Sequence, residues 1–142
     1  MRYFNTHGPV NAEEHYVVSR QALLSDLLTQ IESGKYFTIY APRQMGKTTL
    51  LEQMVESLRT WEGYLPIPLS FERFESWQVA DFMAEVGELI VFHLKQALHT
   101  HPDFAKIEHL LLDAPKDFRP FEHFFRQLYK LLPWIKVVLI VD

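Results

Sequence analysis

One loop with a glycine and a lysine, set between two apolar segments, constrains this chain more than any other feature. Residues 41–49 read Ala-Pro-Arg-Gln-Met-Gly-Lys-Thr-Thr, and they match the pattern G-x-x-x-x-G-K-[ST] except that Ala41 replaces the first glycine. Residues 35–40 are rich in aromatic and β-branched side chains, which predicts a strand. Residues 47–59 repeat apolar side chains at helical spacing. Strand, loop and helix in this order are the context that a phosphate-binding loop requires.

The residue types in this loop suit a nucleotide triphosphate held with Mg²⁺. Backbone N–H groups of residues 44–49 are expected to converge at a helix N-terminus, where their partial positive charge favours phosphate. Gly46 permits a backbone angle that other residues resist. Lys47 brings a positive charge to the β- and γ-phosphates, and the Thr48 hydroxyl completes the Mg²⁺ shell. We therefore predict ATP and Mg²⁺ as cofactors, and a catalytic role for Lys47. The predicted cofactor-binding residues of the loop are Ala41, Pro42, Arg43, Gln44, Met45, Gly46, Lys47, Thr48 and Thr49.

The last seven residues predict the second half of a nucleotide site. Residues 137–141 are Val-Val-Leu-Ile-Val, an unbroken apolar run typical of a fully buried parallel strand. Asp142 follows this run, where a carboxylate can orient the Mg²⁺ shell as in the Walker B element. We predict Asp142 and Thr48 as the metal-site residues. An aspartate that merely ends a strand is the structural alternative.

The rest of the chain predicts an α/β fold that alternates strands with helices. We expect a P-loop NTPase three-layer fold with a parallel sheet and a helical insertion, truncated after the Walker B strand. The expected parts of this single domain are a lead-in over the nucleotide at 1–18, a P-loop core at 19–76, the helical insertion at 77–132 and the Walker B strand at 136–142. The expected elements are a helix from the N-cap Ser19 to Gly34, a strand at 65–71 with Pro66 and Pro68 near a sheet edge, and helices at 77–99, 107–112 and 120–132.

Composition excludes several other classes of protein. A net charge of -4 and a pI near 6.0 give no global attraction to a phosphate backbone, so the sequence carries no strong nucleic-acid signal, and such a role would need a local basic patch. The absence of Cys excludes disulfides and Cys zinc sites, and the seven His match no metal-ligand spacing. No apolar run is long enough to span a bilayer. We expect a cytoplasmic protein with no membrane partner.

These segments together resemble a family of bacterial AAA-like (ASCE-type) P-loop ATPases, related to the archaeal ATPase and STAND groups. The resemblance is carried by residues 4–9, 15–16, 36–49 and the terminal strand with Asp142, and Ala-Pro-Arg-Gln-x-Gly-Lys-[ST] looks like that family's own version of the loop. It implies an ATP-binding ATPase module that switches conformation with its nucleotide. In similar proteins the lead-in and first helix cover the adenine, which makes Tyr16, Val17, Val18 and Arg20 candidate base contacts. A staple of the N-terminal segment onto the core is the structural alternative.

The resemblance also bears on catalysis. Family members place a catalytic glutamate directly after the Walker B aspartate, whereas this sequence ends at Asp142. We therefore expect a truncated product whose unpaired sheet edges favour self-association or a protein partner. Glu72 is the alternative catalytic base, since it follows the strand at 65–71; a surface pair with Arg73 is the competing interpretation. The alternative functions are a small-molecule or nucleotide kinase and a noncatalytic nucleotide-binding scaffold.

Overall fold

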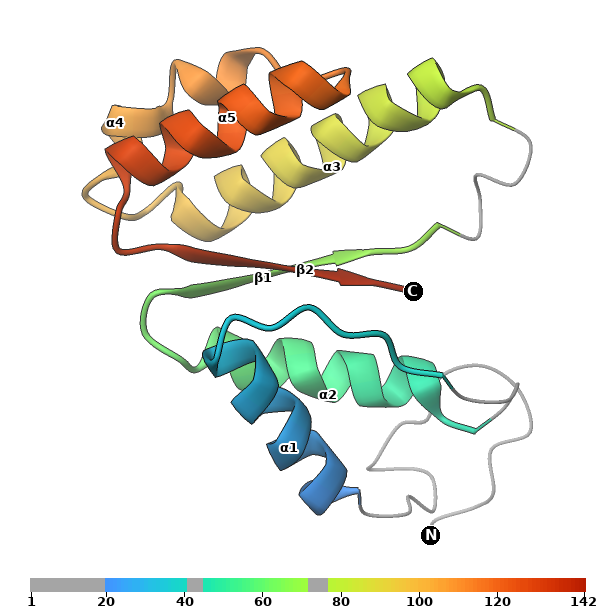
Figure 1. Cartoon of the computed structure of the whole chain (residues 1–142). Helices are drawn as coiled ribbons and strands as arrows, with labels where there is room; N and C mark the ends of the chain where they lie inside the picture. The colour runs from blue at the N-terminus through green and yellow to red at the C-terminus, as the bar shows by residue number, and fades with distance from the viewer. Residues whose placement is uncertain (1–19, 41–44, 72–76) are drawn as a thin grey trace, which may run out of the picture. The chain divides into compact units, whose positions relative to one another are not determined.

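The computed structural model describes residues 20–40, 45–71 and 77–142, and its contacts divide the chain into two units, residues 1–60 and residues 61–142 (Figure 1). Each unit has its own helices, and both strands belong to the second. No helix in the described ranges is long and apolar enough to cross a membrane.

The first unit contains helix α1, Gln21–Glu32, and helix α2, Lys47–Arg59. Helix α1 ends in a Schellman motif, in which Gly34 N donates to Ile31 O at 2.9 Å and Lys35 N donates to Gln30 O at 3.0 Å. Gly34 has a φ of 68°, as this motif requires. The sequence prediction that the first helix ends at Gly34 is confirmed.

Helices α1 and α2 pack against each other through their apolar faces. Leu24 and Leu27 of α1 are buried, whereas the neighbouring Leu23 is exposed. Helix α2 has the boundaries that the sequence predicts. Its buried residues are Leu50, Leu51, Met54, Val55 and Leu58.

Residues 35–40 form no strand, so the predicted strand before the loop is wrong for this structure. These residues have no regular secondary structure, and Tyr36 and Tyr40 are fully exposed. A strand is defined by its hydrogen bonds to a neighbouring strand, and the described residues contain one two-stranded sheet that does not include this segment. Aromatic and β-branched residues favour strands only where a sheet gives their side chains something to pack on.

The second unit is built on a parallel pair of strands, β1 at Tyr64–Leu69 and β2 at Lys136–Val141, with Leu65 opposite Val137 and Leu69 opposite Val141. This mixed architecture with a parallel sheet confirms the predicted α/β class. Between the strands lie α3 at Val79–Leu98, α4 at Phe104–Ile107, the short 3₁₀ helix η2 at Leu110–Leu112, and α5 at Phe118–Leu131.

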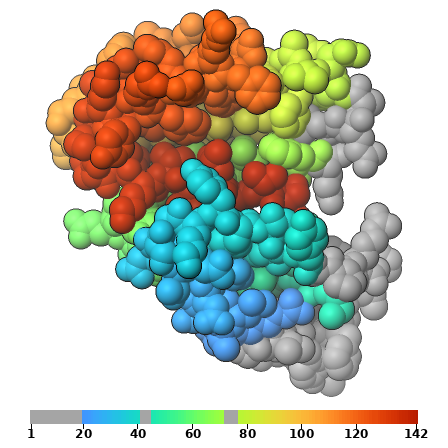
Figure 2. Space-filling view, in the orientation of Figure 1, coloured from blue at the N-terminus to red at the C-terminus, as the bar shows by residue number. Residues whose placement is uncertain are grey.

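The helices of the second unit lie on one side of its sheet (Figure 1), and Figure 2 shows them packed on the strands. Their apolar faces and the sheet form one core. Its most buried residues include Ile67 of β1, Ile90 and Leu94 of α3, Ile107 of α4, Leu111 of η2, and Leu128 of α5.

Helix boundaries in this unit differ from the sequence predictions by a few residues. Helix α3 begins at Val79, after Gln78, whereas the sequence predicted a start at residue 77. The single helix expected at 107–112 is replaced by α4 and η2. Helix α5 begins at Phe118, where the side chain of Asp117 accepts from Phe118 N at 2.7 Å, and Pro120 lies in its first turn as predicted.

Strand β1 tolerates two prolines because of the side from which it pairs. Lys136 N donates to Gly63 O at 2.7 Å and Asp142 N donates to Leu69 O at 2.9 Å. The backbone N–H and C=O groups of the odd-numbered residues of β1 therefore point toward β2. Groups on a strand alternate between its two edges. Pro66 and Pro68 therefore lie on the edge away from β2, where their missing N–H groups break no bond of the ladder.

Strand β2 is parallel as predicted, but it is not fully buried. Ile140 is buried, while Leu139 and Val141 are 44% and 48% exposed. A parallel strand is buried throughout only when it has neighbours on both edges and cover on both faces. In the described part of the chain, β2 pairs on one edge alone.

Candidate phosphate-binding site

A glycine in the left-handed conformation stands at the N-terminus of α2. Gly46 precedes the helix in the left-handed conformation, with φ 73° and ψ 29°, which agrees with the backbone angle expected from the sequence. A non-glycine residue would lose roughly 1–2 kcal/mol in this conformation. The helix starts at this glycine, since Leu50 N donates to Gly46 O at 3.1 Å.

The first turn of α2 carries the cation Lys47. The first turn contains no acidic residue, and Gly46 has no side chain that could cap the helix. Lys47 is the first helical residue, and a lysine there lies at the positive end of the helix dipole, where a cation is unfavourable by a few tenths of a kcal/mol or more, up to about 1 kcal/mol. An anion bound at this point would reverse the sign of that interaction.

The side chains of the described loop residues are accessible from solvent. Met45 is 51% exposed and Thr48 is exposed, while Lys47 and Thr49 are partly buried. Lys47, Thr48 and Thr49 each take part in further interactions within the structure. The hydroxyl and the ammonium groups that the sequence assigned to Mg²⁺ and phosphate thus follow Gly46 directly on the first turn of α2.

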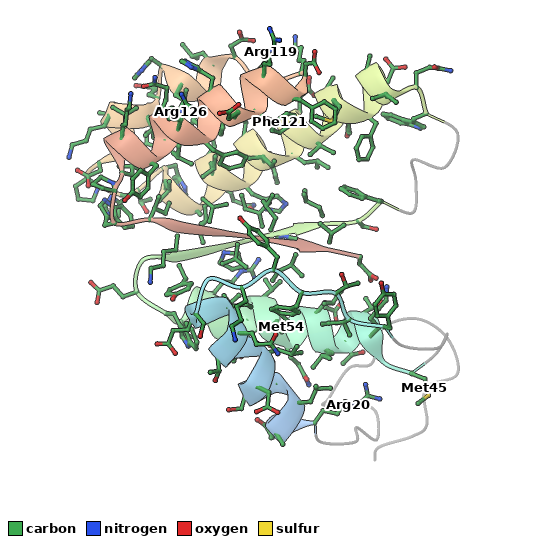
Figure 3. All side chains as sticks on the ribbon, in the orientation of Figure 1. Arg20, Met45, Met54, Arg119, Phe121 and Arg126 are labelled. Carbon is green, nitrogen blue, oxygen red and sulfur yellow. The ribbon has the colours of Figure 1, made fainter. Side chains whose placement is uncertain are left out.

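Arg20 is the second cation at this site. Its carbonyl accepts from Leu24 N at 2.9 Å at the start of α1, and its guanidinium extends to Gly46. A methyl group placed on Gly46 would lie 3.9 Å from Arg20 Nη2 and 4.0 Å from Nη1. Figure 3 shows Arg20 and Met45 at the same end of the two-helix unit. No local pattern in the sequence places Arg20 beside Gly46, because the contact depends on how α1 packs on α2.

Asp142 lies at the carboxyl end of the parallel pair in the second unit. Its N–H donates to Leu69 O at 2.9 Å, and its carbonyl accepts from Phe71 N at 2.9 Å. Ligands of open α/β sheets bind at this end of the strands. Thr48 belongs to the first unit and Asp142 to the second, so their pairing at one metal ion stays a prediction.

Several predicted site residues lie outside the described residues, namely Tyr16, Val17, Val18, Ala41, Pro42, Arg43, Gln44 and Glu72. Within the described ranges, no group of three or more His, Asp or Glu side chains could hold a metal ion.

The amino-acid sequence was compared with known families, curated proteins and solved structures. A family model described as "AAA-like domain" matches residues 5–98. That range includes the loop at 41–49, α1, α2, β1 and α3. No curated protein and no solved structure matches the chain.

Proposed function

Because the chain belongs to the AAA-like domain family, we propose that it is an ATP-binding ATPase module in which residues 41–49 hold MgATP and the nucleotide drives a conformational switch. Family membership makes a nucleotide-binding, ATPase-like module the general class of this protein, as the sequence resemblance indicated. The observation that supports the specific site is the N-terminus of α2, with a left-handed Gly46 and with Lys47 in a first turn that contains no acidic residue.

Each loop residue has a role in this proposal that follows from its chemistry. Backbone N–H groups from Met45 to Thr49 face the phosphate oxygens, and Lys47 neutralises the β- and γ-phosphates. Thr48 and Asp142 hold the Mg²⁺ shell, which oxygen ligands suit. Glu72 is the candidate base for the attacking water.

The proposal includes a fold for the whole ATPase. A P-loop three-layer arrangement would bring residues 19–76 and 136–142 together around one parallel sheet, with residues 77–132 as a helical insertion and residues 1–18 over the nucleotide. The loop at 41–49 and Asp142 would then meet at one edge of that sheet. A protein partner would respond to this nucleotide-driven conformational change.

A kinase is the weaker alternative. Kinases hold their phosphates with mobile arginines, and the insertion at 77–132 has Arg119 and Arg126 for this purpose. Arg126 forms an ion pair with Glu122 on the exposed face of α5, so this arginine already has a carboxylate partner. A noncatalytic scaffold remains the second alternative, distinguished by binding without turnover.

The decisive experiment is MgATP binding by titration calorimetry on the full chain, on Lys47→Ala and on Lys35→Ala, with phosphate release measured on the same samples. Lys35 is an exposed lysine of the same unit and serves as the matched control. We expect the parent and Lys35→Ala to bind and Lys47→Ala to lose binding. Equal binding by Lys47→Ala would refute the site, and a folded parent chain that binds no MgATP would refute the function.

Phosphate release then separates the remaining possibilities. Turnover by the parent that is lost in Glu72→Gln, with binding retained, supports Glu72 as the base. Binding without any turnover by the parent supports the scaffold instead.

A further inference from the structure

Strand β2 pairs with β1 on one edge, and no described residue pairs with its other edge. We propose that two copies of this chain associate through that second edge, with their β2 strands antiparallel and related by a two-fold axis at Leu139. The partner is therefore a second copy of the chain. The contact needs no nucleotide, so it can be tested separately from the proposed function.

The backbone of β2 supplies the hydrogen-bonding groups for this contact. In the ladder with β1, the even-numbered residues of β2 exchange the hydrogen bonds, from Lys136 N at one end to Asp142 O at the other. Backbone groups alternate between the two edges of a strand. The residues whose N–H and C=O groups point to the second edge are therefore Val137, Leu139 and Val141, and each offers one donor and one acceptor.

The outer edge of β1 does not offer such a row. Pro66 and Pro68 lie on that edge and have no N–H group to donate. An edge that contains proline is protected against pairing with another chain. Of the two outer edges of this sheet, that of β2 is therefore the one suited to strand pairing.

The number of hydrogen bonds determines the register. An antiparallel pairing centred on Leu139 places Leu139 opposite its copy and Val137 opposite Val141 of the second copy. Residues opposite each other in this way exchange two hydrogen bonds per pair. A shift in register leaves at least one of the three residues without such a partner, so the pairing centred on Leu139 forms the most hydrogen bonds.

The apolar side chains along this edge are exposed. Leu139 and Val141 are 44% and 48% exposed, although they lie on the same face of the sheet as Val137, which packs against the core. In the proposed pairing, Leu139 contacts its copy and Val141 contacts Val137 of the second copy. The contact thus buries apolar surface at the same residues that form the hydrogen bonds.

The charges at the two ends of β2 favour the antiparallel direction. The register centred on Leu139 places Lys136 of each copy opposite Asp142 of the other, in a pair whose Cα atoms are about 4.5 Å apart. An in-register parallel pairing would instead place like charges side by side, which is destabilising.

Both charged residues also interact within one chain. The Lys136 ammonium donates to Tyr64 Oη at 3.2 Å, and its three N–H donors allow a carboxylate as a further acceptor. Asp142 takes part in further interactions. The backbone ladder therefore supplies the contact between copies, and the charges select its direction.

The first experiment tests direction and register by disulfide formation. The sequence contains no Cys, so one introduced Cys can form a disulfide only between two copies. We expect Leu139→Cys to give a disulfide-linked dimer on oxidation, because the two Cα atoms are about 5.5 Å apart. Val137→Cys is the matched control and stays monomeric, since its copy lies about 13 Å away along the strand. A mixture of Val137→Cys and Val141→Cys gives the mixed dimer.

The second experiment tests the charges by exchanging them. Sedimentation equilibrium at low salt gives the dimer dissociation constants of the parent, of Lys136→Glu, and of Lys136→Asp combined with Asp142→Lys. The control is Lys116→Glu, at an exposed lysine before α5. Nucleotide and divalent metal are left out, because the proposed function assigns Asp142 to Mg²⁺. Thermal unfolding verifies that each variant is folded.

We expect Lys136→Glu to weaken the dimer about tenfold, because two attractive pairs become repulsive. The exchange of both charges restores most of the parent affinity, and Lys116→Glu dimerises like the parent. A substitution that only disturbed the fold of one chain would not be rescued by the exchange.

Three results would overturn the proposal. Cross-linking of Val137→Cys as complete as that of Leu139→Cys would exclude the antiparallel register. A folded exchange variant that dimerises no better than Lys136→Glu would show that the two charges do not face each other. A parent chain that stays monomeric at its highest soluble concentration would show that this edge does not join two copies. None of these results bears on MgATP binding, which the Lys47→Ala titration tests.

Discussion

Asp103, a partly buried residue, links two segments of the second unit. Its carboxylate forms a salt bridge with Lys106 at 2.7 Å and accepts from Trp134 Nε1 at 3.2 Å. The Trp134 ring in turn lies against His101, with their centroids 4.7 Å apart. The α4 region is thus connected to the residues that lead into β2.

These contacts lower the pKa of Asp103 below its usual value. The hydrogen bond from Lys106 is the largest cause, and the Trp134 bond and the charges of Lys106 and His101 act in the same direction, against an opposing effect of burial. The carboxylate is therefore favoured in the folded state. A group whose pKa is depressed on folding adds stability above its unfolded pKa, and that stability is lost as the pH falls through its folded pKa.

We predict that Asp103→Asn lowers the free energy of unfolding at neutral pH and that the difference from the parent shrinks toward zero below about pH 4. Urea unfolding at a series of pH values measures this, with Asp26→Asn in the first unit as the control. A constant difference between Asp103→Asn and the parent down to low pH would contradict the prediction.

At the scale of elements, one glycine sets how closely α3 approaches its neighbour. A Cβ atom on Gly87 would overlap the carbonyl oxygen of Pro115, in the segment before α5. The backbones therefore touch at this point, next to the core residues Val86 and Ile90. No side chain fits between them.

We predict that Gly87→Ala destabilises the protein, by about 1–3 kcal/mol, because the helix must move away from Pro115. Helix propensity alone predicts the opposite sign, a gain of roughly 1 kcal/mol. The control is Ala97→Gly on the exposed face of α3, for which propensity alone predicts a loss of up to about 1 kcal/mol. Equilibrium unfolding in urea measures which of the two effects is larger. A more stable Gly87→Ala would show that the close contact between α3 and Pro115 is not rigid.

The pairing of β1 with β2 also explains why Pro66 and Pro68 fit within a strand. They occupy the edge that faces away from β2, and a strand edge without donors is protected against pairing with another chain. Sequence alone indicated an edge position for this strand, and the ladder of β1 with β2 shows which edge it is.

At the scale of the whole molecule, the proposed site needs residues from both units. Lys47 and Thr48 belong to residues 1–60, and Asp142 belongs to residues 61–142. A bound Mg²⁺ would connect Thr48 and Asp142 only if the Asp142 carboxylate helps to hold the metal ion and does not interact with the phosphates instead.

We predict that Asp142→Asn weakens ATP binding in the presence of Mg²⁺ by about tenfold or more and leaves metal-free ATP binding nearly unchanged. Lys47→Ala, in contrast, weakens both. Calorimetry with MgCl₂ and with a chelator measures the difference, and Asp113→Asn, an exposed aspartate before α5, is the control. Equal losses with and without Mg²⁺ would assign Asp142 to a structural role at the end of β2.

Local signals in the sequence determined much of this protein. The spacing of Leu50, Met54 and Leu58 set the buried face of α2, because a helix repeats its faces every 3.6 residues. Gly34 marked the end of α1 and Gly46 the start of α2, because both conformations favour glycine. The apolar run at 137–141 predicted a parallel strand, and the loop at 41–49 predicted the family.

Tertiary structure alone decided the features that need two distant segments. Residues 35–40 have strand propensity without a ladder partner, and Leu139 stays exposed for want of neighbours around β2. Arg20 reaches Gly46, and Gly87 touches Pro115, only through the packing of helices. Propensity and periodicity act over a few adjacent residues, whereas strand pairing, burial and the meeting of charges depend on which surfaces the folded chain brings together.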